Sequence, residues 1–159
     1  MALACCLGWS APASAQEPSL LPGVTVAAGW AGFADEGLIH HGVIGAGVEW
    51  IATRHLAVGA EIHHAIGPGA DRDLFALGVV RIGVLPFSRA IVPFVTAGAG
   101  LMRHSDRFFT GTAASTEGAL VVGGGVRLRL SPRVYVAPEA EIGWEPHVRV
   151  GVTAGITLR

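Results

Sequence analysis

The stretch HVRVGVTAGITL, residues 147–158, alternates two kinds of side chain without interruption. One set of positions is entirely aliphatic: Val148, Val150, Val152, Ala154, Ile156 and Leu158. The other set is polar or glycine: His147, Arg149, Gly151, Thr153, Gly155 and Thr157. Because successive side chains of a β-strand point to opposite faces, this stretch predicts a strand with one apolar and one polar face.

Similar alternation recurs along the chain and predicts eight strands. Their expected ranges are 23–33, 39–51, 55–65, 74–85, 91–103, 118–130, 133–144 and 147–158. Each range is long enough for the roughly 9–11 residues of a tilted membrane strand. The fourth range is ambiguous, because Leu77 and Val79 share a face with Arg81.

The connections between these ranges alternate in length. Short ones at 52–54, 86–89 and 131–133 alternate with longer or more acidic ones at 34–38, 66–73, 104–117 and 145–146. Short turns at one rim and longer loops at the other are typical of an outer-membrane barrel. A soluble meander, which also alternates turn lengths, is the alternative.

The composition favours a membrane barrel. The 159 residues are 51% hydrophobic and 14% charged, whereas a soluble domain carries about 25% charged residues. The chain has no apolar run of about 18 residues that could form a membrane helix. With a formal net charge of −1 and no basic motif, nucleic acid is not expected as a partner. The continuous apolar faces are therefore expected to point outward to lipid, because a soluble barrel places them inside.

Residues 1–15 resemble a secretory signal peptide with Ala13-Ser14-Ala15 as its cleavage site. Its positive n-region is missing, so the true start is expected upstream. A retained apolar helix and a lipoprotein signal ending at Cys5 are the alternatives. Residues 16–22 are then a short lead-in and 23–159 the barrel domain. Both cysteines, Cys5 and Cys6, fall in the leader, which leaves the mature chain without thiol chemistry.

Charged residues fall within the strands in equal numbers of each sign: Glu49, Glu61, Arg81, Arg127, Arg129, Glu139, Glu141 and Arg149. Eight strands enclose only enough room for side chains, and an unpaired charge there costs several kcal/mol. We therefore predict a salt-bridged network that fills the lumen. A narrow, gated or proton-conducting path is the functional alternative.

Trp30, Trp50 and Trp144 fall on the apolar faces near strand ends. That placement predicts an aromatic girdle at both membrane boundaries, with scattered core tryptophans as the alternative.

Six histidines fall near the loop-rich end of the predicted strands: His40, His41, His63, His64, His104 and His147. Nearby are Asp35, Asp71, Asp73 and Asp106, so a metal-binding or pH-responsive rim is conceivable. However, adjacent histidines on a strand point to opposite faces, and chelation would need His41 to meet His63 across strands. We therefore expect no metal site and no cofactor.

Three stretches, PFVTAGAG at 93–100, GGGVRL at 123–128 and LSPR at 130–133, resemble the small eight-stranded outer-membrane β-barrels, the outer-membrane-protein-A-like group. The resemblance runs from about Val24 to the end of the chain. It implies insertion into the outer membrane from the periplasm and carries over no catalytic residue. The family's peptidoglycan-binding domain is not expected here, and the chain ends in Arg159 where such barrels usually end in an aromatic residue. Pro138, in mid-strand, predicts a bulge.

The expected fold class is all-β: an eight-stranded antiparallel up-and-down transmembrane β-barrel after a cleaved signal peptide. The expected role is structural, adhesive or recognition through the segments 34–38, 66–73 and 104–117. In the last of these, Phe108 and Phe109 could contact an extracellular partner or lipid headgroups.

Two other functions remain open at this stage. One is a secreted soluble barrel that binds a small apolar ligand. The other is an enzyme that resembles the lipid A deacylases, with His104, Ser105 and Glu117 as its Ser-His-Glu set. We expect no enzymatic activity, because the adjacent His104 and Ser105 would point to opposite faces of a strand.

Overall fold

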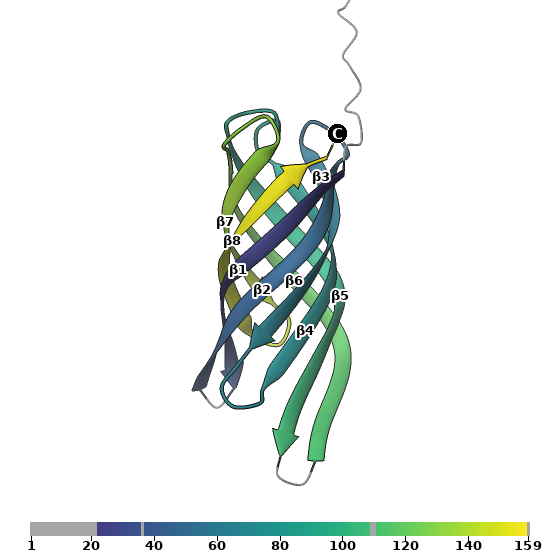
Figure 1. Ribbon diagram of the computed structural model, residues 1–159, viewed down its shortest axis with the longest axis vertical. Helices are drawn as coiled ribbons and strands as arrows, with labels where there is room; N and C mark the ends of the chain where they lie inside the picture. The colour runs from purple at the N-terminus through teal and green to yellow at the C-terminus, as the bar shows by residue number, and fades with distance from the viewer. Residues whose placement is uncertain (1–21, 36, 109–110, 159) are drawn as a thin grey trace, which may run out of the picture.

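Eight antiparallel strands close into a single barrel (Figure 1). The computed structural model describes residues 22–35, 37–108 and 111–158. The strands are β1 (Pro22–Asp35), β2 (Gly37–Ile51), β3 (Leu56–Ile66), β4 (Arg72–Gly83), β5 (Ile91–Phe108), β6 (Gly111–Arg129), β7 (Val134–Gly143) and β8 (His147–Thr157). Each strand pairs with its neighbours in sequence, and β8 closes the barrel against β1. The predicted fold class is confirmed.

The signal peptide predicted at 1–15 and most of the lead-in at 16–22 lie outside the described residues. Within the described ranges, no helix is long and apolar enough to cross a membrane.

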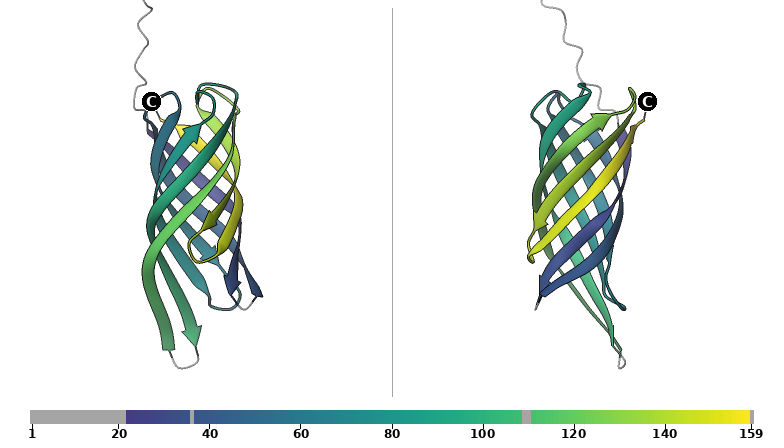
Figure 2. Two further views of the ribbon diagram at one scale, coloured as in Figure 1. Left: turned by 180° about the vertical axis from the view of Figure 1, so that it is seen from behind. Right: turned by 90° about the vertical axis from the view of Figure 1, so that its left-hand side faces the viewer.

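The two ends of the barrel differ. The turns β2–β3, β4–β5 and β6–β7 gather at one end, which we call the short-turn rim (Figures 1 and 2). The connections β1–β2, β3–β4, β5–β6 and β7–β8 gather at the other end, the loop rim. Both rims lie where the alternating connection lengths predicted them.

Residues 104–108 and 111–117 extend β5 and β6 as the two arms of a hairpin, so the prediction of 104–117 as a long loop was wrong. β5 and β6 pair in unbroken register from Ile91 opposite Leu128 to Phe108 opposite Gly111. This hairpin projects past the other strands at the loop rim (Figure 2). The segment 34–38 is likewise almost entirely strand, because β1 and β2 pair as far as Asp35 and Gly37. Backbone pairing continues in both places although the alternation of apolar side chains has ended.

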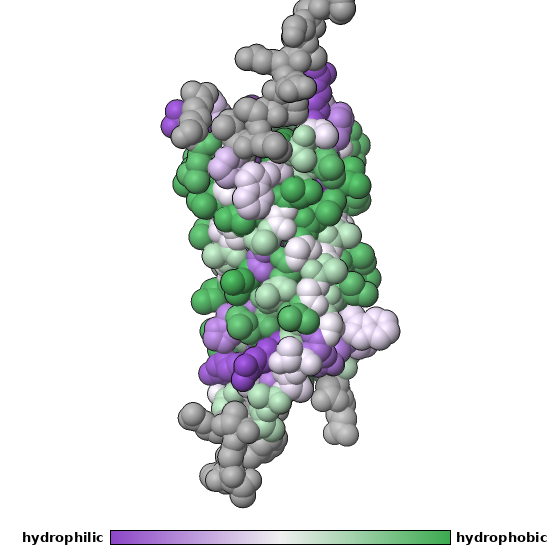
Figure 3. All heavy atoms as spheres, turned by 90° about the vertical axis from the view of Figure 1, so that its right-hand side faces the viewer, coloured by the Kyte–Doolittle hydropathy of each residue, from purple (hydrophilic) through white to green (hydrophobic). Residues whose placement is uncertain are grey.

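The apolar faces of the strands point outward. Val152 is 50% exposed, and Val148, Val150 and Ile156 on the same strand are exposed as well. In Figure 3, hydrophobic residues form a band around the middle of the visible face, between two more polar ends. Exposed aliphatic bands bounded by polar rims are typical of transmembrane barrels.

β4 settles the ambiguous fourth range. Its residues Leu77, Val79 and Arg81 are all buried inside the barrel, whereas Val80 and Ile82 are exposed outside. The interior therefore mixes apolar with charged residues on a single strand face, and apolar side chains alone do not mark the outward face.

Pro138 lies in β7 without a bulge, contrary to the prediction. Gly125 faces Glu139 and Leu128 faces Val136, so equal numbers of residues separate these two pairs on β6 and β7. Pairing lapses only between them, because proline has no N–H to donate. Pro138 keeps its place opposite Val152 on the other side, in β8.

Candidate functional site

Arg81 is the centre of the lumen network, and its side chain touches three carboxylates. Its guanidinium donates a hydrogen bond to Glu61. Nη1 lies 3.6 Å from Oε2 of Glu49, and Nη2 lies 3.7 Å from Oε2 of Glu139. All four side chains are buried. Because β2, β3, β4 and β7 each supply one of them, the contacts cross the barrel interior.

Arg127, on β6, is the second cation of this network. Its Nη1 donates to Oε1 of Glu49 at 2.9 Å, and the Tyr135 hydroxyl donates to the same oxygen at 3.1 Å. The Arg127 guanidinium lies over the Tyr135 ring, 3.5 Å from its centroid. Such cation–π contacts strengthen when water is excluded. Tyr135 was not singled out in the sequence, because one tyrosine on a strand carries no distinctive pattern.

Gly155 leaves the room that Tyr135 occupies. A methyl group at Gly155 would overlap the Tyr135 ring. We expect Gly155→Ala to lower the free energy of unfolding by about 1–3 kcal/mol, the usual range for overpacking a filled interior. Gly118→Ala is the matched control, because a methyl group there meets no heavy atom within 4 Å. Urea unfolding in detergent micelles compares the two, and equal stability would count against this packing.

The other charges predicted for the lumen stand apart from this central group. Glu141 and Arg149 form their own ion pair between β7 and β8. Arg129 lies near the short-turn rim, where its Nη2 donates to the carbonyl oxygen of Phe87 at 2.8 Å. His63 takes a place in the network instead, with Nε2 3.0 Å from Oε2 of Glu61. Strand parity alone could have placed His63 inside, since it shares a face with Glu61.

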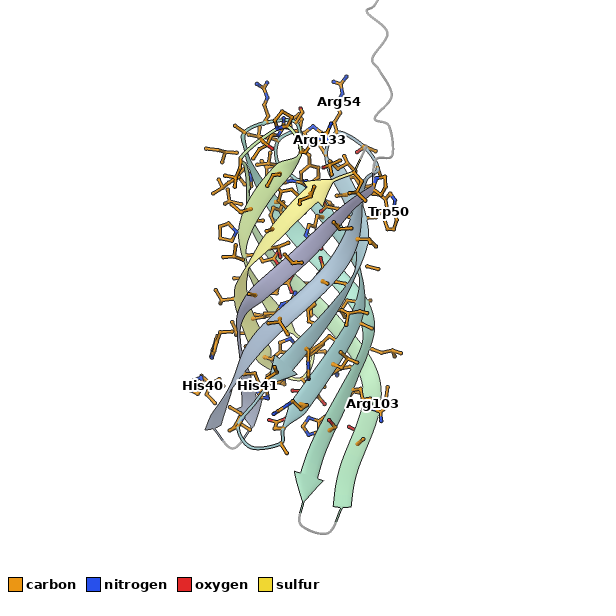
Figure 4. All side chains as sticks on the ribbon, viewed as in Figure 1. His40, His41, Trp50, Arg54, Arg103 and Arg133 are labelled. Carbon is orange, nitrogen blue, oxygen red and sulfur yellow. The ribbon has the colours of Figure 1, made fainter. Side chains whose placement is uncertain are left out.

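The three tryptophans predicted to form a girdle lie on the outer face of the barrel. Trp144 is 69% exposed near the loop rim. Trp30, near the same rim, donates from Nε1 to Nδ1 of His40 at 3.2 Å. Trp50 points outward near the short-turn rim (Figure 4). The side chain of Phe108 and the whole of Phe109, predicted as loop contacts, lie outside the described part of the structure.

An open cavity of about 430 Å³ lies at the loop rim. We call it the rim cavity. Its polar walls carry two imidazoles and four carboxylates: His41, Asp71, Asp73, His104, Glu117 and Glu145. No arginine is among the described residues that line it. The cavity therefore presents concentrated negative charge with no built-in cation other than a protonated imidazole.

One wall of the rim cavity brings imidazoles and carboxylates into direct contact. His41 Nε2 lies 2.8 Å from Oδ2 of Asp71 and 3.5 Å from Oδ2 of Asp73. His104 Nδ1 lies 2.7 Å from Oδ1 of Asp73 and 3.7 Å from Oδ1 of Asp71. His41 and Asp73 are almost fully buried, at 2% and 3% exposure.

The pairing of His41 with His63, which the sequence suggested as a requirement for chelation, does not occur. His63 faces Gly45, deeper in the barrel, whereas His41 lies beside Gly67 and Asp71 of the β3–β4 connection. Of the adjacent histidines in β2, His40 is exposed outside and His41 is buried inside, as strand parity requires (Figure 4).

Two further carboxyls line the rim cavity: Glu117 on β6 and Glu145 on the strained β7–β8 turn. Glu145 has φ 55°, in the left-handed region that residues other than glycine rarely adopt. Burial, a hydrogen bond to Glu117 and the charge of that carboxylate raise the pKa of Glu145 above its usual value. The turn is held by its backbone, since Ala34 N donates to Pro146 O at 2.8 Å.

A layer of rings separates the rim cavity from the lumen network. Phe33 stacks on His147 with centroids 5.0 Å apart, and Phe75 lies 5.4 Å from His147. Below it, two interior cavities measure about 10 Å³ each, roughly the space of one water molecule. The two sites are thus physically distinct.

Comparison with known proteins rests on structure alone, since no family model and no curated protein sequence matches the chain. Neisserial surface protein A superposes with a TM-score of 0.77 at 12% identity, over 86% of this chain and 97% of that one. The N-terminal β-barrel domain of Pseudomonas aeruginosa OprF gives a TM-score of 0.68 at 10% identity, over 86% and 97%. This chain has the fold of the small eight-stranded outer-membrane β-barrels.

A third structure of this fold is Ail, the attachment invasion locus protein of Yersinia pestis, solved with the heparin analogue sucrose octasulfate. It has a TM-score of 0.60 at 11% identity, over 86% of this chain and 96% of that one. The resemblance predicted from the stretches at 93–100, 123–128 and 130–133 is confirmed at the level of the fold. Identities this low say nothing about ligands or activity.

In this small outer-membrane barrel fold, the residues proposed for a hydrolase do not assemble. Ser105 donates from Oγ to the carbonyl oxygen of Arg72 at 3.3 Å. Its neighbour His104 turns to the other face and meets Asp73 in the rim cavity. Glu117 lines the same cavity as His104, but the nucleophile that a triad requires is on the wrong side of the strand.

Proposed function

We propose that this protein resides in the bacterial outer membrane, with a plugged lumen, and serves in envelope structure or in recognition at its loop rim. The observation that carries the proposal is the inverted distribution of polarity. Large aliphatic residues are exposed around the outside, while Glu49, Glu61 and Arg81 are buried inside. Water would favour the reverse arrangement, whereas a lipid surround favours this one.

The filled interior supports a role other than conduction. Between the rings below the rim cavity and the short-turn rim lie the central ion network and a packed cluster around Phe87, Val92 and Phe94. Val92 is completely buried. An ion crossing the barrel would have to displace several paired charges at once, which is expensive at low dielectric.

The loop rim is the surface best suited to recognition. The paired strands β5 and β6 project there beyond the other strands, and the acidic rim cavity opens beside them. Ail was solved with a heparin analogue, but the carboxylates of this cavity would repel a polyanion. A cationic or metal-bearing partner fits the cavity charge better.

Three measurements test the proposal together. The refolded protein is expected to migrate differently in a detergent gel before and after boiling, and to float with lipid vesicles. In planar bilayers it is expected to show no ion conductance above that of protein-free membranes. Full solubility without detergent would favour the secreted apolar-ligand barrel instead, and steady conductance would show that the lumen is open.

A further inference from the structure

Three donor groups of the rim cavity lie close enough together to share one ion, and a fourth, His104, contacts two of them. One donor atom each from His41, Asp71 and Asp73 lies within 4.8 Å of the other two. A tetrahedral ion with bonds of about 2.0–2.2 Å separates its donors by about 3.3–3.6 Å. The distance from His41 Nε2 to Asp73 Oδ2 is 3.5 Å, and from His104 Nδ1 to Asp71 Oδ1 it is 3.7 Å. The two hydrogen-bonded pairs, at 2.8 and 2.7 Å, need to open by less than about 1 Å.

Two of these donors are held in place before any ion binds. His41 and Asp73 are buried on β2 and β4, each of which is paired with a neighbouring strand on both sides. Asp71 lies on the β3–β4 connection, which is closed on itself because Gly67 N donates to Asp71 O at 3.1 Å. A set of donors fixed by the scaffold loses little entropy when it takes up an ion.

The carboxylate oxygens of the cavity favour a bound cation. Oδ1 of Asp71 is buried and accepts no hydrogen bond among the described residues. An unsatisfied buried carboxylate oxygen is costly, and an ion bound between Asp71 and His104 would satisfy it. Glu117 and Glu145 also line the cavity and add further carboxyl oxygens to it.

We propose that the rim cavity binds one divalent transition-metal ion of the Zn²⁺ class through His41, Asp71, Asp73 and His104. Two imidazoles and two carboxylates form a mixed nitrogen and oxygen set that suits Zn²⁺, Ni²⁺ and Co²⁺. Ca²⁺ prefers about 6–8 oxygen ligands, so it fits this set poorly. The site lies beyond the ring layer, on the open side of the cavity, and is independent of whether the lumen conducts or the loop rim binds a partner.

The test is a titration of the folded protein in detergent micelles with Zn²⁺, followed by calorimetry. One ion is expected to bind per chain. His104→Ala and Asp71→Asn are each expected to weaken binding at least about tenfold, since even outer-sphere partners of metals have effects of about 10–100-fold. Co²⁺ is expected to give the visible absorption of a four-coordinate site in the wild type and to lose it in both variants.

His64→Ala is the matched control, because His64 lies near the same rim on the outer face of β3 and is expected to keep full Zn²⁺ affinity. Heat-modifiable migration shows that each variant is folded. Equal Zn²⁺ affinity of the wild type and both cavity variants would overturn the proposal. So would an equal loss in His64→Ala, or displacement of Zn²⁺ by an equal concentration of Ca²⁺.

Discussion

Replacing Arg81 by methionine is expected to lower the free energy of unfolding by about 3–5 kcal/mol, the range for removing one partner of a buried ion pair. The loss is large because Glu49, Glu61 and Glu139 all lie within 4 Å of this guanidinium. Arg127 still reaches Glu49 and His63 still reaches Glu61. Glu139 would keep only the hydroxyl of Thr153 as a hydrogen-bond donor among the described residues.

The double variant Arg81→Met with Glu61→Met distinguishes the loss of the ion-pair attraction from the cost of leaving a buried carboxylate unpaired. If the cost arises from an unpaired buried carboxylate, removing Glu61 as well recovers part of the stability, and the double-mutant cycle gives a coupling energy of about 1–3 kcal/mol. Urea unfolding in lipid vesicles measures all members of the cycle.

Arg103→Met is the matched control, because Arg103 projects from the outer surface near the loop rim (Figure 4). It is expected to change stability by no more than about 0.5 kcal/mol. Should Arg81→Met cost no more than Arg103→Met, the central network would not stabilise the barrel, and the plugged lumen would lose its main support.

The face of each strand could be predicted from the sequence because side-chain parity depends only on neighbouring residues. The outward position of Val148, Val150 and Val152 follows directly from the alternation in β8. Parity also places Glu61 and His63 together inside. Parity groups the residues of a face but does not show which face points outward where the interior is itself apolar, as with Leu77 and Val79 beside Arg81.

Partners across the lumen could not be predicted, because they depend on the stagger of the closed sheet. Arg127 and Glu49 are 78 residues apart and meet across the interior. Equal numbers of acids and arginines in the sequence suggested one neutral network, yet Glu141 with Arg149 forms a separate pair and Arg129 meets a backbone carbonyl. The number of charged residues shows which groups lie inside the barrel but not which of them form ion pairs.

The contacts within the rim cavity could not be predicted for a similar reason. The sequence places these histidines and aspartates near one rim, but it suggests a contact between His41 and His63, which lie at different depths in the barrel. The true neighbours of His41 come from the β3–β4 connection, whose closed shape turns Asp71 inward. The extension of β5 brings His104 to the same place. The alternation of apolar side chains that marks the other strands is missing from this extension, so the sequence did not predict it as strand.

Val152→Arg is expected to lower the free energy of unfolding in lipid vesicles by about 2–4 kcal/mol, the cost of an arginine at the lipid-facing midplane of a barrel. Val152 is the middle residue of β8, is 50% exposed, and lies opposite Ala28 and Pro138 of the flanking strands. Neither of these directly paired neighbours can take up a cation, and the new guanidinium would have to reach water past about half the membrane thickness.

Val148→Arg is the depth control, because it lies on the same face about 13 Å along the strand toward the loop rim. There an arginine can reach the interface, and the expected cost falls to about 0–1 kcal/mol. A soluble barrel predicts something different: both positions would be ordinary surface sites, and both substitutions would change stability by no more than about 0.5 kcal/mol. Urea unfolding in vesicles measures the loss of stability in both variants. A larger loss for Val152→Arg than for Val148→Arg is expected only if the outward aliphatic residues face acyl chains.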